Sequence, residues 1–199
     1  MSPASPDEID RSKGWEEVAA DFIRHRRLSD IGAATVREWT QLLPEGAEVL
    51  ELGCGSGVPI SEVLIGAGFD VYGVDASPTL SEEFHRHFPT AHIACEPAET
   101  SAFFNRTFDA AVAWGLLFLL PPETQKDLIQ RVARVLVPGG RFLFTAPTQV
   151  ATWNDLSTGR ESVSLGFDAY KGELEKAGFA LGGQYVDEGD NHYYDAVKQ

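Results

Sequence analysis

The stretch Val49-Leu-Glu-Leu-Gly-Cys-Gly-Ser-Gly57 decides the fold of this chain. Residues 48–52 alternate as a strand does, glycines follow at positions 53, 55 and 57, and an apolar helical pattern begins at Val58. The sequence therefore predicts a strand, a tight turn and a helix. Glycines allow a sharp turn and let a ligand approach main-chain atoms that a Cβ would block. We predict that this turn is the mouth of a ligand site.

Length and composition favour a single domain of ordinary size. The chain has 199 residues, of which 43% are hydrophobic, enough for a real core. Its 16 basic and 30 acidic residues give a formal net charge of -14, which argues against nucleic acid or an anionic membrane surface as a partner. The N-terminus does not resemble a signal peptide, and no apolar run approaches the roughly 18 residues of a membrane span. We expect a cytoplasmic monomer or homodimer.

Cysteine and histidine spacing gives no support for a disulfide framework or a metal site. Cys54 and Cys95 lack the Cys-x-x-Cys spacing of cysteine-rich zinc sites. His85 and His87 are two residues apart on an expected helix, so they point to different faces. We therefore expect no metal and a reduced, cytosolic setting.

Apolar periodicity predicts helices that alternate with strands along most of the chain. The expected strands cover residues 47–52, 69–74, 91–95, 108–114 and 141–146, and a final antiparallel hairpin covers 179–186 and 193–197. This alternation predicts a doubly wound α/β fold: a mostly parallel, seven-stranded sheet with helices on both faces and an antiparallel C-terminal hairpin. Ligands of such sheets bind beyond the carboxyl ends of the strands.

The same pass along the sequence predicts the domain organisation. We expect residues 1–12 to be a disordered leader and residues 13–199 to be one domain. Its expected parts are two N-terminal cap helices forming a lid (13–43), a ligand-binding core (44–146), a substrate-facing loop (147–166), and a helix with a hairpin (167–199). Residues 147–166 are polar and aperiodic, and a connection of that length is more often a functional lid than a simple link.

The glycine loop could belong to a dinucleotide site, because Asp75 lies about 20 residues downstream, where a ribose-binding acid is expected. Three features argue against it: the spacing is G-x-G-x-G, no Lys-Ser or Lys-Thr follows, and Glu51 places an anion where pyrophosphate would bind. A ligand with a ribose and a positive charge but no phosphate suits the loop better. An NAD-type or other nucleotide-binding Rossmann protein remains an alternative, as does a catalytically silent binding module.

Four segments, in this order, resemble the successive motifs of the class I S-adenosylmethionine-dependent methyltransferases. They are Glu51-Leu-Gly-Cys-Gly-Ser-Gly57, Val71-Tyr-Gly-Val-Asp-Ala-Ser77, Phe108-Asp-Ala-Ala-Val112 and Leu136-Val-Pro-Gly-Gly140. The resemblance covers about residues 47–146, roughly half of the chain. It implies a Rossmann-like fold, S-adenosyl-L-methionine as cofactor with S-adenosyl-L-homocysteine as product, and methyl transfer by in-line displacement.

The resemblance also implies which residues bind the cofactor. The glycine loop would contact the methionine part and the ribose through backbone atoms, with Glu51 beneath it favouring positive charge. Asp75 would accept from both ribose hydroxyls, because a carboxylate offers two acceptor oxygens. The full expected set is Glu51, Gly53, Cys54, Gly55, Asp75, Ala76, Ser77, Ala98, Glu99 and Trp114.

One position departs from the family pattern. Many relatives carry an aspartate before the Ala98-Glu99 pair, in the loop that closes over the adenine edge, and this chain has Pro97 there. Glu96, Glu99 or the Ala98 amide could substitute, so the residue that recognises the base stays open.

Catalysis and substrate binding are less specified than the cofactor site. Methyl transfer needs alignment above all, and a general base only if the acceptor arrives protonated. The candidates for catalysis are His192 and Tyr193, and His192 could equally be a plain turn residue. The candidates for substrate binding are Arg26, Leu117, Arg160 and His192.

Arg26 has two interpretations. It belongs to a basic run at an expected helix end, where it could complement the helix dipole or clamp a ligand carboxylate over the glycine loop. Since no dedicated substrate domain fits into this length, we expect a small-molecule methyl acceptor.

Overall fold

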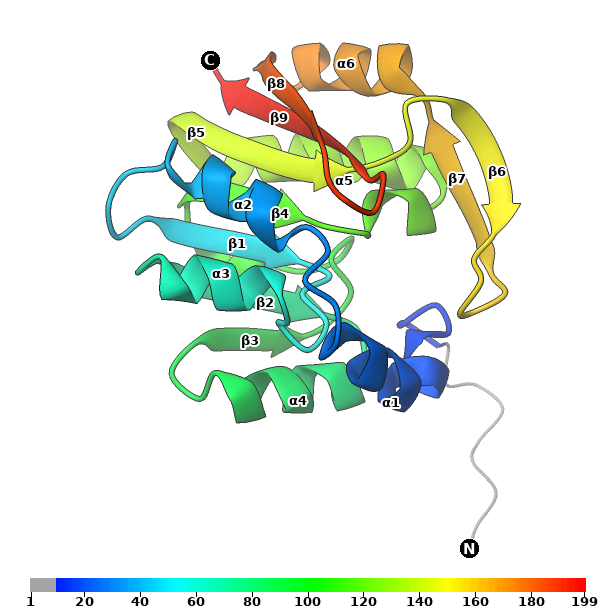
Figure 1. Cartoon of the computed structure of the whole chain (residues 1–199). Coiled ribbons are helices and arrows are strands. Elements are labelled where there is room, and N and C mark those ends of the chain that lie inside the picture. Colours follow the sequence, from blue (N-terminus) through cyan, green and yellow to red (C-terminus); the bar gives the residue numbers. More distant parts are fainter. Residues whose placement is uncertain (1–9) are drawn as a thin grey trace, which may run out of the picture.

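A twisted seven-stranded sheet runs through the middle of the computed structural model, which describes residues 10–199 (Figure 1). Its strand order is β3-β2-β1-β4-β5-β9-β8, with β1 to β5 parallel and β9 antiparallel to both β5 and β8. The strands are β1 (Glu48–Leu52), β2 (Asp70–Asp75), β3 (His92–Cys95), β4 (Phe108–Ala113), β5 (Leu136–Thr145), β8 (Phe179–Val186) and β9 (His192–Lys198). The predicted fold class is confirmed.

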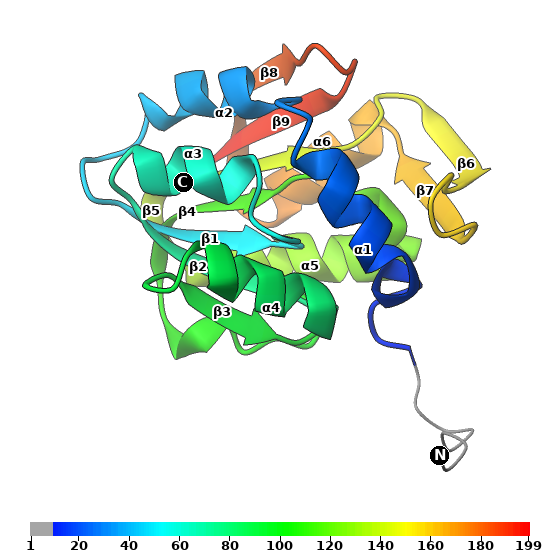
Figure 2. The same ribbon diagram turned by 60° about the horizontal axis from the view of Figure 1, so that its bottom comes forward.

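Helices cover both faces of the sheet (Figure 2). They are α1 (Trp15–Arg26), α2 (Ala33–Thr40), α3 (Ile60–Gly66), α4 (Pro78–His87), α5 (Pro122–Val135) and α6 (Phe167–Lys176). One core cluster joins α5 and α6 to the sheet through Leu50, Phe142 and Phe144, and the other joins α2, α3 and α4 to it through Val49 and Leu143. Successive strand residues point to opposite faces, so neighbours such as Val49 and Leu50 enter different clusters. The near-continuous apolar strands follow from this double burial.

The segment expected as a loop over 147–166 is instead an antiparallel hairpin, β6 (Val150–Asn154) and β7 (Glu161–Leu165). Its exposure alternates along both strands, as it does in a sheet with one face covered. Gln125 of α5 donates from Nε2 to the Val163 carbonyl at 2.8 Å, and the Trp153 ring lies 5.6 Å from that of Phe118. The prediction of a loop was wrong because two five-residue strands carry too short a pattern to stand out from polar sequence.

Residues 1–9 of the expected leader lie outside the described residues. Residues 10–12 are ordered, contrary to the expectation: the Asp10 carboxylate accepts from the amides of Ser12 at 3.0 Å and Gly14 at 2.6 Å, and Ser12 is buried. An aspartate that accepts from amides a few residues ahead forms a local turn, which composition alone does not reveal. Within the described part of the chain, no helix combines the length and apolarity that crossing a bilayer requires.

Candidate functional site

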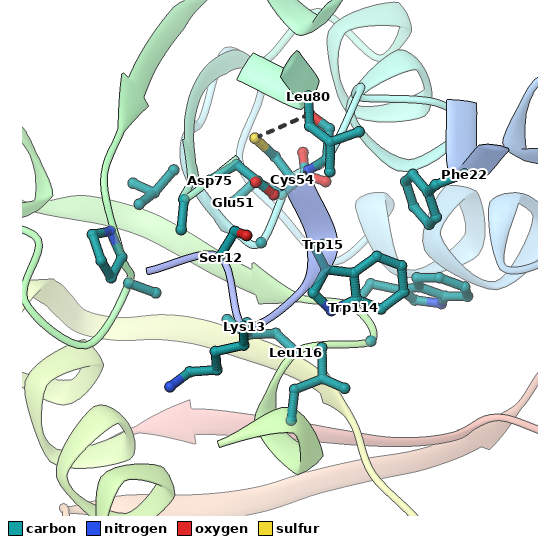
Figure 3. Close-up of a pocket in the computed structure, with 18 of the residues that line it drawn as sticks. Ser12, Lys13, Trp15, Phe22, Glu51, Cys54, Asp75, Leu80, Trp114 and Leu116 are labelled. Carbon is teal, nitrogen blue, oxygen red and sulfur yellow. Dashed lines mark hydrogen bonds between the residues drawn. The ribbon is translucent and has the colours of Figure 1, made fainter. Parts of the chain in front are cut away.

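A cavity of about 230 Å³ lies beyond the carboxyl ends of β1, β2 and β4 (Figure 3). We call the side formed at the ends of β1 and β2 the floor: Glu51, Gly53, Cys54, Gly55, Asp75 and Ala76. We call the covering side the roof: Arg11, Ser12, Lys13, Trp15, Phe22 and Arg26, all in or just before α1. Figure 3 shows Glu51, Cys54 and Asp75 grouped together, with Trp15 and Phe22 beside the cavity. The cavity thus lies between a loop of the sheet and a helix that precedes the sheet in sequence.

The glycine loop that forms part of the floor has a backbone that only glycines adopt easily. Gly53, Gly55 and Gly57 have φ values of +66°, +57° and +81°. The amides of Gly53 and Cys54 donate to the Val74 carbonyl at 2.8 and 3.2 Å, so the loop is tied to β2. A Cβ on Gly57 would lie 2.5 Å from a ring carbon of Phe88. The loop geometry therefore depends on glycine for both conformation and space.

Asp75 ends β2 at the centre of the floor. Its Oδ2 accepts from the Gly55 amide at 2.8 Å and its Oδ1 from the Ser77 amide at 2.9 Å. Burial raises the pKa of this carboxyl, and those two amide hydrogen bonds oppose the rise. Each oxygen keeps a further lone pair, so the carboxylate can accept two more hydrogen bonds from a ligand.

Glu51 lies beneath the loop and is 3% exposed. Burial raises its pKa to about 8, the nearby Asp75 adds to the rise, and the Ser61 hydroxyl, which donates to it at 2.5 Å, opposes it. The carboxyl is therefore largely protonated at neutral pH. A positively charged ligand above it would favour the ionised form, because an adjacent opposite charge lowers a carboxyl pKa.

The roof is fastened to the rest of the molecule by side chains of the N-terminal segment. Glu16 accepts from the Thr79 amide at 3.1 Å and the Thr79 hydroxyl at 2.6 Å, and from the Ser77 hydroxyl. Lys13 pairs with Glu99 at 3.2 Å. The Trp15 and Phe22 rings meet edge to face at 5.2 Å, giving the roof an apolar underside.

A chain of polar contacts holds the far wall of the cavity. The Arg26 guanidinium lies over the Trp114 ring, with its central carbon 4.3 Å from the ring centroid. Trp114 donates from Nε1 to the Tyr193 hydroxyl at 2.7 Å, and this hydroxyl donates to Asp187 at 2.8 Å. The Trp114 ring is thereby fixed from both its face and its edge.

Most of the residues predicted for the site line this one cavity. They are Arg26, Glu51, Gly53, Cys54, Gly55, Asp75, Ala76, Ala98, Glu99 and Trp114. They come from α1, the ends of three strands and the loop after β3, as expected where parallel strands end together. The burial of Cys54, which also raises its thiol pKa, agrees with a backbone role in the turn.

Two predicted residues face the protein instead of the cavity. Ser77 is fully buried, and its hydroxyl accepts from the Leu80 amide at 3.2 Å as the N-cap of α4. Leu117 is fully buried in the core, because a single 3-10 turn, η2 (Leu117–Leu119), follows β4 and directs its first side chain inward. The apolar run after β4 gave no indication of which residues turn inward.

Three further candidates lie outside the cavity lining. Arg160 pairs with Asp10 at 2.9 Å on the surface. His192 begins β9, and its carbonyl accepts from the Ala146 amide at 3.0 Å. Tyr193 is buried, and burial followed by the hydrogen bond to Asp187 raises its pKa, which opposes a role as a base. Their positions depend on strand register and long-range pairing, which the local pattern does not contain.

Sequence reasoning missed several lining residues. The structure adds Ser12, Lys13, Trp15, Phe22, Leu116, Phe118, Asp155 and Asn191 to the cavity. Trp15 and Phe22 did recur at helical spacing, but that pattern indicates a buried face without saying whether it covers the core or a cavity. Over residues 10–199, no group of three or more His, Cys, Asp or Glu side chains is arranged to hold a metal ion.

Comparison with known proteins bears directly on this site. Residues 49–140, which include the glycine loop, Asp75 and Trp114, match the model of a family described as "Methyltransferase domain". The match covers a little less than half of the chain. The class I resemblance found in the motifs is thereby confirmed, and the methyltransferase domain carries the floor of the cavity, whereas the roof precedes it.

Relatives and solved structures extend the comparison beyond the methyltransferase domain. The chain is 28% identical over 144 residues to a 2-methyl-6-phytyl-1,4-hydroquinone methyltransferase of Synechocystis, covering 71% of this chain and 42% of the relative. It is 36% identical over 99 residues to a cypemycin N-terminal methyltransferase of Streptomyces, covering 48% of this chain and 40% of the relative. The chain thus spans less than half the length of these two curated relatives.

The whole fold has counterparts among solved structures. Magnesium protoporphyrin IX methyltransferase from Synechocystis, crystallised with bound S-adenosylmethionine, superposes with a TM-score of 0.74 at 16% identity, covering 98% of this chain and 100% of that one. At this identity the match shows a shared fold. The α1 roof and the β6–β7 hairpin therefore lie within the part of the chain that superposition covers.

Proposed function

We propose that the chain is an S-adenosylmethionine-dependent methyltransferase that acts on a small-molecule acceptor. The single observation that carries this proposal is the floor of the cavity. Asp75 lies beside a three-glycine turn, with both carboxylate oxygens held by backbone amides and each able to accept once more. This arrangement suits the two neighbouring hydroxyls of a ribose.

The electrostatics of the floor support a cationic nucleoside over a dinucleotide. Glu51 lies beneath the loop, and its ionised form would stabilise a positive charge while repelling a pyrophosphate. When bound, S-adenosylmethionine supplies a sulfonium methyl group for transfer by in-line displacement. The floor residues would hold its ribose and amino acid parts, and Pro97, Ala98 and Glu99 would lie along the base.

The roof supports a small acceptor and a dry reaction site. Trp15, Phe22, Trp114 and Phe118 line the cavity with aromatic rings, and its volume is about 230 Å³. Excluding water and aligning acceptor, methyl carbon and sulfur are the main tasks of a protein in this displacement. The relatives named above for a hydroquinone and a porphyrin act on small molecules by their names, which agrees with this choice.

A thermal-shift comparison tests the proposal. At 100 times its Kd, a ligand that binds only the folded state adds roughly 2.7 kcal/mol of stability. We expect S-adenosylmethionine and S-adenosylhomocysteine to raise the Tm, and NAD to leave it unchanged. Stabilisation by NAD and by neither adenosyl ligand would refute the proposal.

Transfer itself is tested with a radiolabelled methyl donor and a panel of acceptors. The panel should include quinols, phenols, primary amines and carboxylic acids of low molecular weight. Incorporation of label into a small molecule supports the proposed class, and its absence across the panel, together with tight cofactor binding, would favour a silent module.

A further inference from the structure

The loop that follows β3 brings Pro97, Ala98 and Glu99 to the wall of the cavity. The Glu99 carboxylate pairs with Lys13 of the roof at 3.2 Å, and Glu96 is not one of the residues that line the cavity. Proline has no N–H group to donate. At this wall, the loop therefore offers a ligand mainly its backbone.

Two amides of this backbone are unused. Within residues 10–199, the N–H groups of Ala98 and Glu99 donate to no carbonyl and no side chain, whereas the next two amides both donate to the Pro97 carbonyl, at 3.1 and 2.9 Å. Ala98 is buried, and buried backbone N–H groups in proteins almost always have a partner. Unused amides at the wall of a cavity are available to a ligand.

Arg131 of α5 holds the carbonyls of the same loop. Its Nη1 donates to the Ala98 carbonyl at 2.8 Å, and its Nη2 donates to the Ser101 carbonyl. Its guanidinium carbon also lies 4.5 Å from the centroid of the buried Phe103 ring. Because one rigid, planar guanidinium makes all three contacts, it fixes the positions of the three groups relative to one another.

The backbone directly after this loop is strained. Phe103, Phe104 and Asn105 have φ values of +46°, +55° and +53°. Left-handed backbone is uncommon for residues other than glycine, and it persists where surrounding contacts hold it. Here the Ser101 hydroxyl accepts from the Phe103 amide at 2.9 Å, and Arg131 covers the Phe103 ring. Contacts outside the cavity thus keep the loop in one form.

The peptide group between Ala98 and Glu99 connects Arg131 to the cavity. In a planar trans peptide, the carbonyl and the N–H that follows it point in opposite directions. Since the Ala98 carbonyl points to Arg131, the Glu99 amide points away from Arg131. Ala98 and Glu99 line the cavity and Arg131 does not. Arg131 therefore sets the direction of a free donor at the cavity wall without reaching the cavity itself.

We propose that Arg131 is a positioning residue that makes this wall selective for adenine, acting through the peptide group of Ala98 and Glu99. The inference rests on the proposed function, because an adenosyl cofactor supplies the base. Adenine presents an unprotonated ring nitrogen beside its amino group, and hypoxanthine presents an N–H at the same position. An amide donor in a fixed direction favours the first and leaves two donors facing each other with the second. A donor that can turn distinguishes them poorly.

Calorimetry with S-adenosylhomocysteine and S-inosylhomocysteine, in which hypoxanthine replaces adenine, tests this inference. The wild type should prefer the adenosyl ligand at least about tenfold, and Arg131→Met should reduce that preference to about threefold or less. The matched control is Arg134→Met, because Arg134 is exposed on the same helix, and it should keep the wild-type preference. Arg131→Lys can still donate to a carbonyl, so it should show an intermediate preference. It replaces Arg131→Met if the latter lowers the Tm.

Two results overturn the inference while the proposed function stands. An unchanged preference in Arg131→Met, with both ligands weakened equally or not at all, would give Arg131 a purely structural role. Equal affinity of the wild type for the two ligands would mean that the wall does not distinguish the bases. Failure of the proposed function looks different: the wild type would bind neither nucleoside, and the inference would fall with it.

Discussion

The floor and the roof of the cavity are built in different ways. The floor is held by backbone hydrogen bonds: the glycine loop is tied to β2, and the Asp75 carboxylate accepts from the amides of Gly55 and Ser77. The roof is made of side chains on α1, held down by Glu16, Lys13 and the apolar contacts of Trp15. The floor is tied into the sheet by backbone hydrogen bonds, whereas the roof is held mainly by side-chain contacts.

This difference suggests a division of labour. A floor held by backbone hydrogen bonds suits precise positioning of the cofactor, and a roof held by side chains suits entry of that cofactor and contact with the acceptor. Variants that change one side of the cavity at a time should therefore affect stability on the floor and ligand release on the roof.

The largest effect is expected on the floor, from Gly57→Ala. A Cβ there would lie 2.5 Å from Phe88 and 2.9 Å from Phe84, at a φ of +81°. A left-handed backbone costs an alanine about 1–2 kcal/mol, and overpacking costs about 1–3 kcal/mol more. The free energy of unfolding, measured in urea, should therefore fall by about 2–5 kcal/mol.

The control for this change is Gly68→Ala. Gly68 has a similar φ of +87°, but a Cβ there meets nothing within 4 Å. In Gly68→Ala the free energy of unfolding should fall only by the cost of the left-handed backbone, about 1–2 kcal/mol. Equal losses in the two variants would show that the floor is not closely packed.

The second prediction concerns the charge of Glu51. Its pKa of about 8 means that a cationic ligand must displace a proton below that pH. S-adenosylhomocysteine lacks the positive charge on sulfur, so it serves as the reference ligand. The ratio of the affinity for S-adenosylmethionine to that for S-adenosylhomocysteine should rise by up to about tenfold between pH 7 and pH 9 and then level off. Calorimetry across this range measures the ratio. In Glu51→Gln the ratio should be flat, and a flat ratio in the wild type would contradict the assignment.

Much of the floor could be predicted from sequence because local chemistry specifies it. Glycine spacing identified the loop, and the end of an apolar strand identified Asp75. The roof could not be predicted in this way: nothing near Arg26 in sequence shows that it will stack on Trp114, which follows it by almost half the chain. The same holds for Tyr193, whose hydroxyl is engaged by Trp114 and Asp187 through the pairing of distant strands.

The third prediction loosens the roof. Glu16→Gln weakens the attachment of α1 to Thr79 and Ser77, and it should raise the dissociation rate of S-adenosylhomocysteine roughly fivefold, since such changes act mainly on koff. The Tm should change little. Glu17→Gln is the control, because Glu17 is exposed on the same turn. Stopped-flow tryptophan fluorescence, to which Trp15 and Trp114 in the cavity lining contribute, follows the rate. Identical rates in both variants would contradict a role of the roof in release of the ligand.

The attachment of the roof should also depend on acid pH. Burial opposes ionisation of Glu16, but the hydrogen bonds from Ser77 and Thr79 outweigh it and lower its pKa. The pKa of Glu83, which pairs with Arg86 and with Arg27 directly after α1, is lowered to about 2. The ionised carboxylates of Glu16 and Glu83 stabilise the attachment of α1 above pH 4.5. This stabilisation is lost as the pH falls through their lowered pKa values. Dissociation should therefore quicken at acid pH, and a rate independent of pH between 6 and 3 would contradict this.

The smallest effect is expected from Arg160→Ala. Its guanidinium pairs with Asp10 at a site where the arginine side chain is 52% exposed. Surface ion pairs of this kind contribute about 0.2–1 kcal/mol to stability, so the free energy of unfolding should change within that range. The Kd for S-adenosylhomocysteine should stay within about twofold of the wild-type value. A tenfold loss of affinity would return Arg160 to the binding site.

The most direct test of the account is calorimetric titration of S-adenosylhomocysteine into Asp75→Ala, with Asp70→Ala at the exposed start of β2 as the control. Two charge-assisted hydrogen bonds lost at Asp75 predict a Kd raised about 100-fold or more. Asp70→Ala and a thermal melt of each variant exclude a general loss of folding. An unchanged Kd in a folded Asp75→Ala protein would mean that the ribose is not held on this floor.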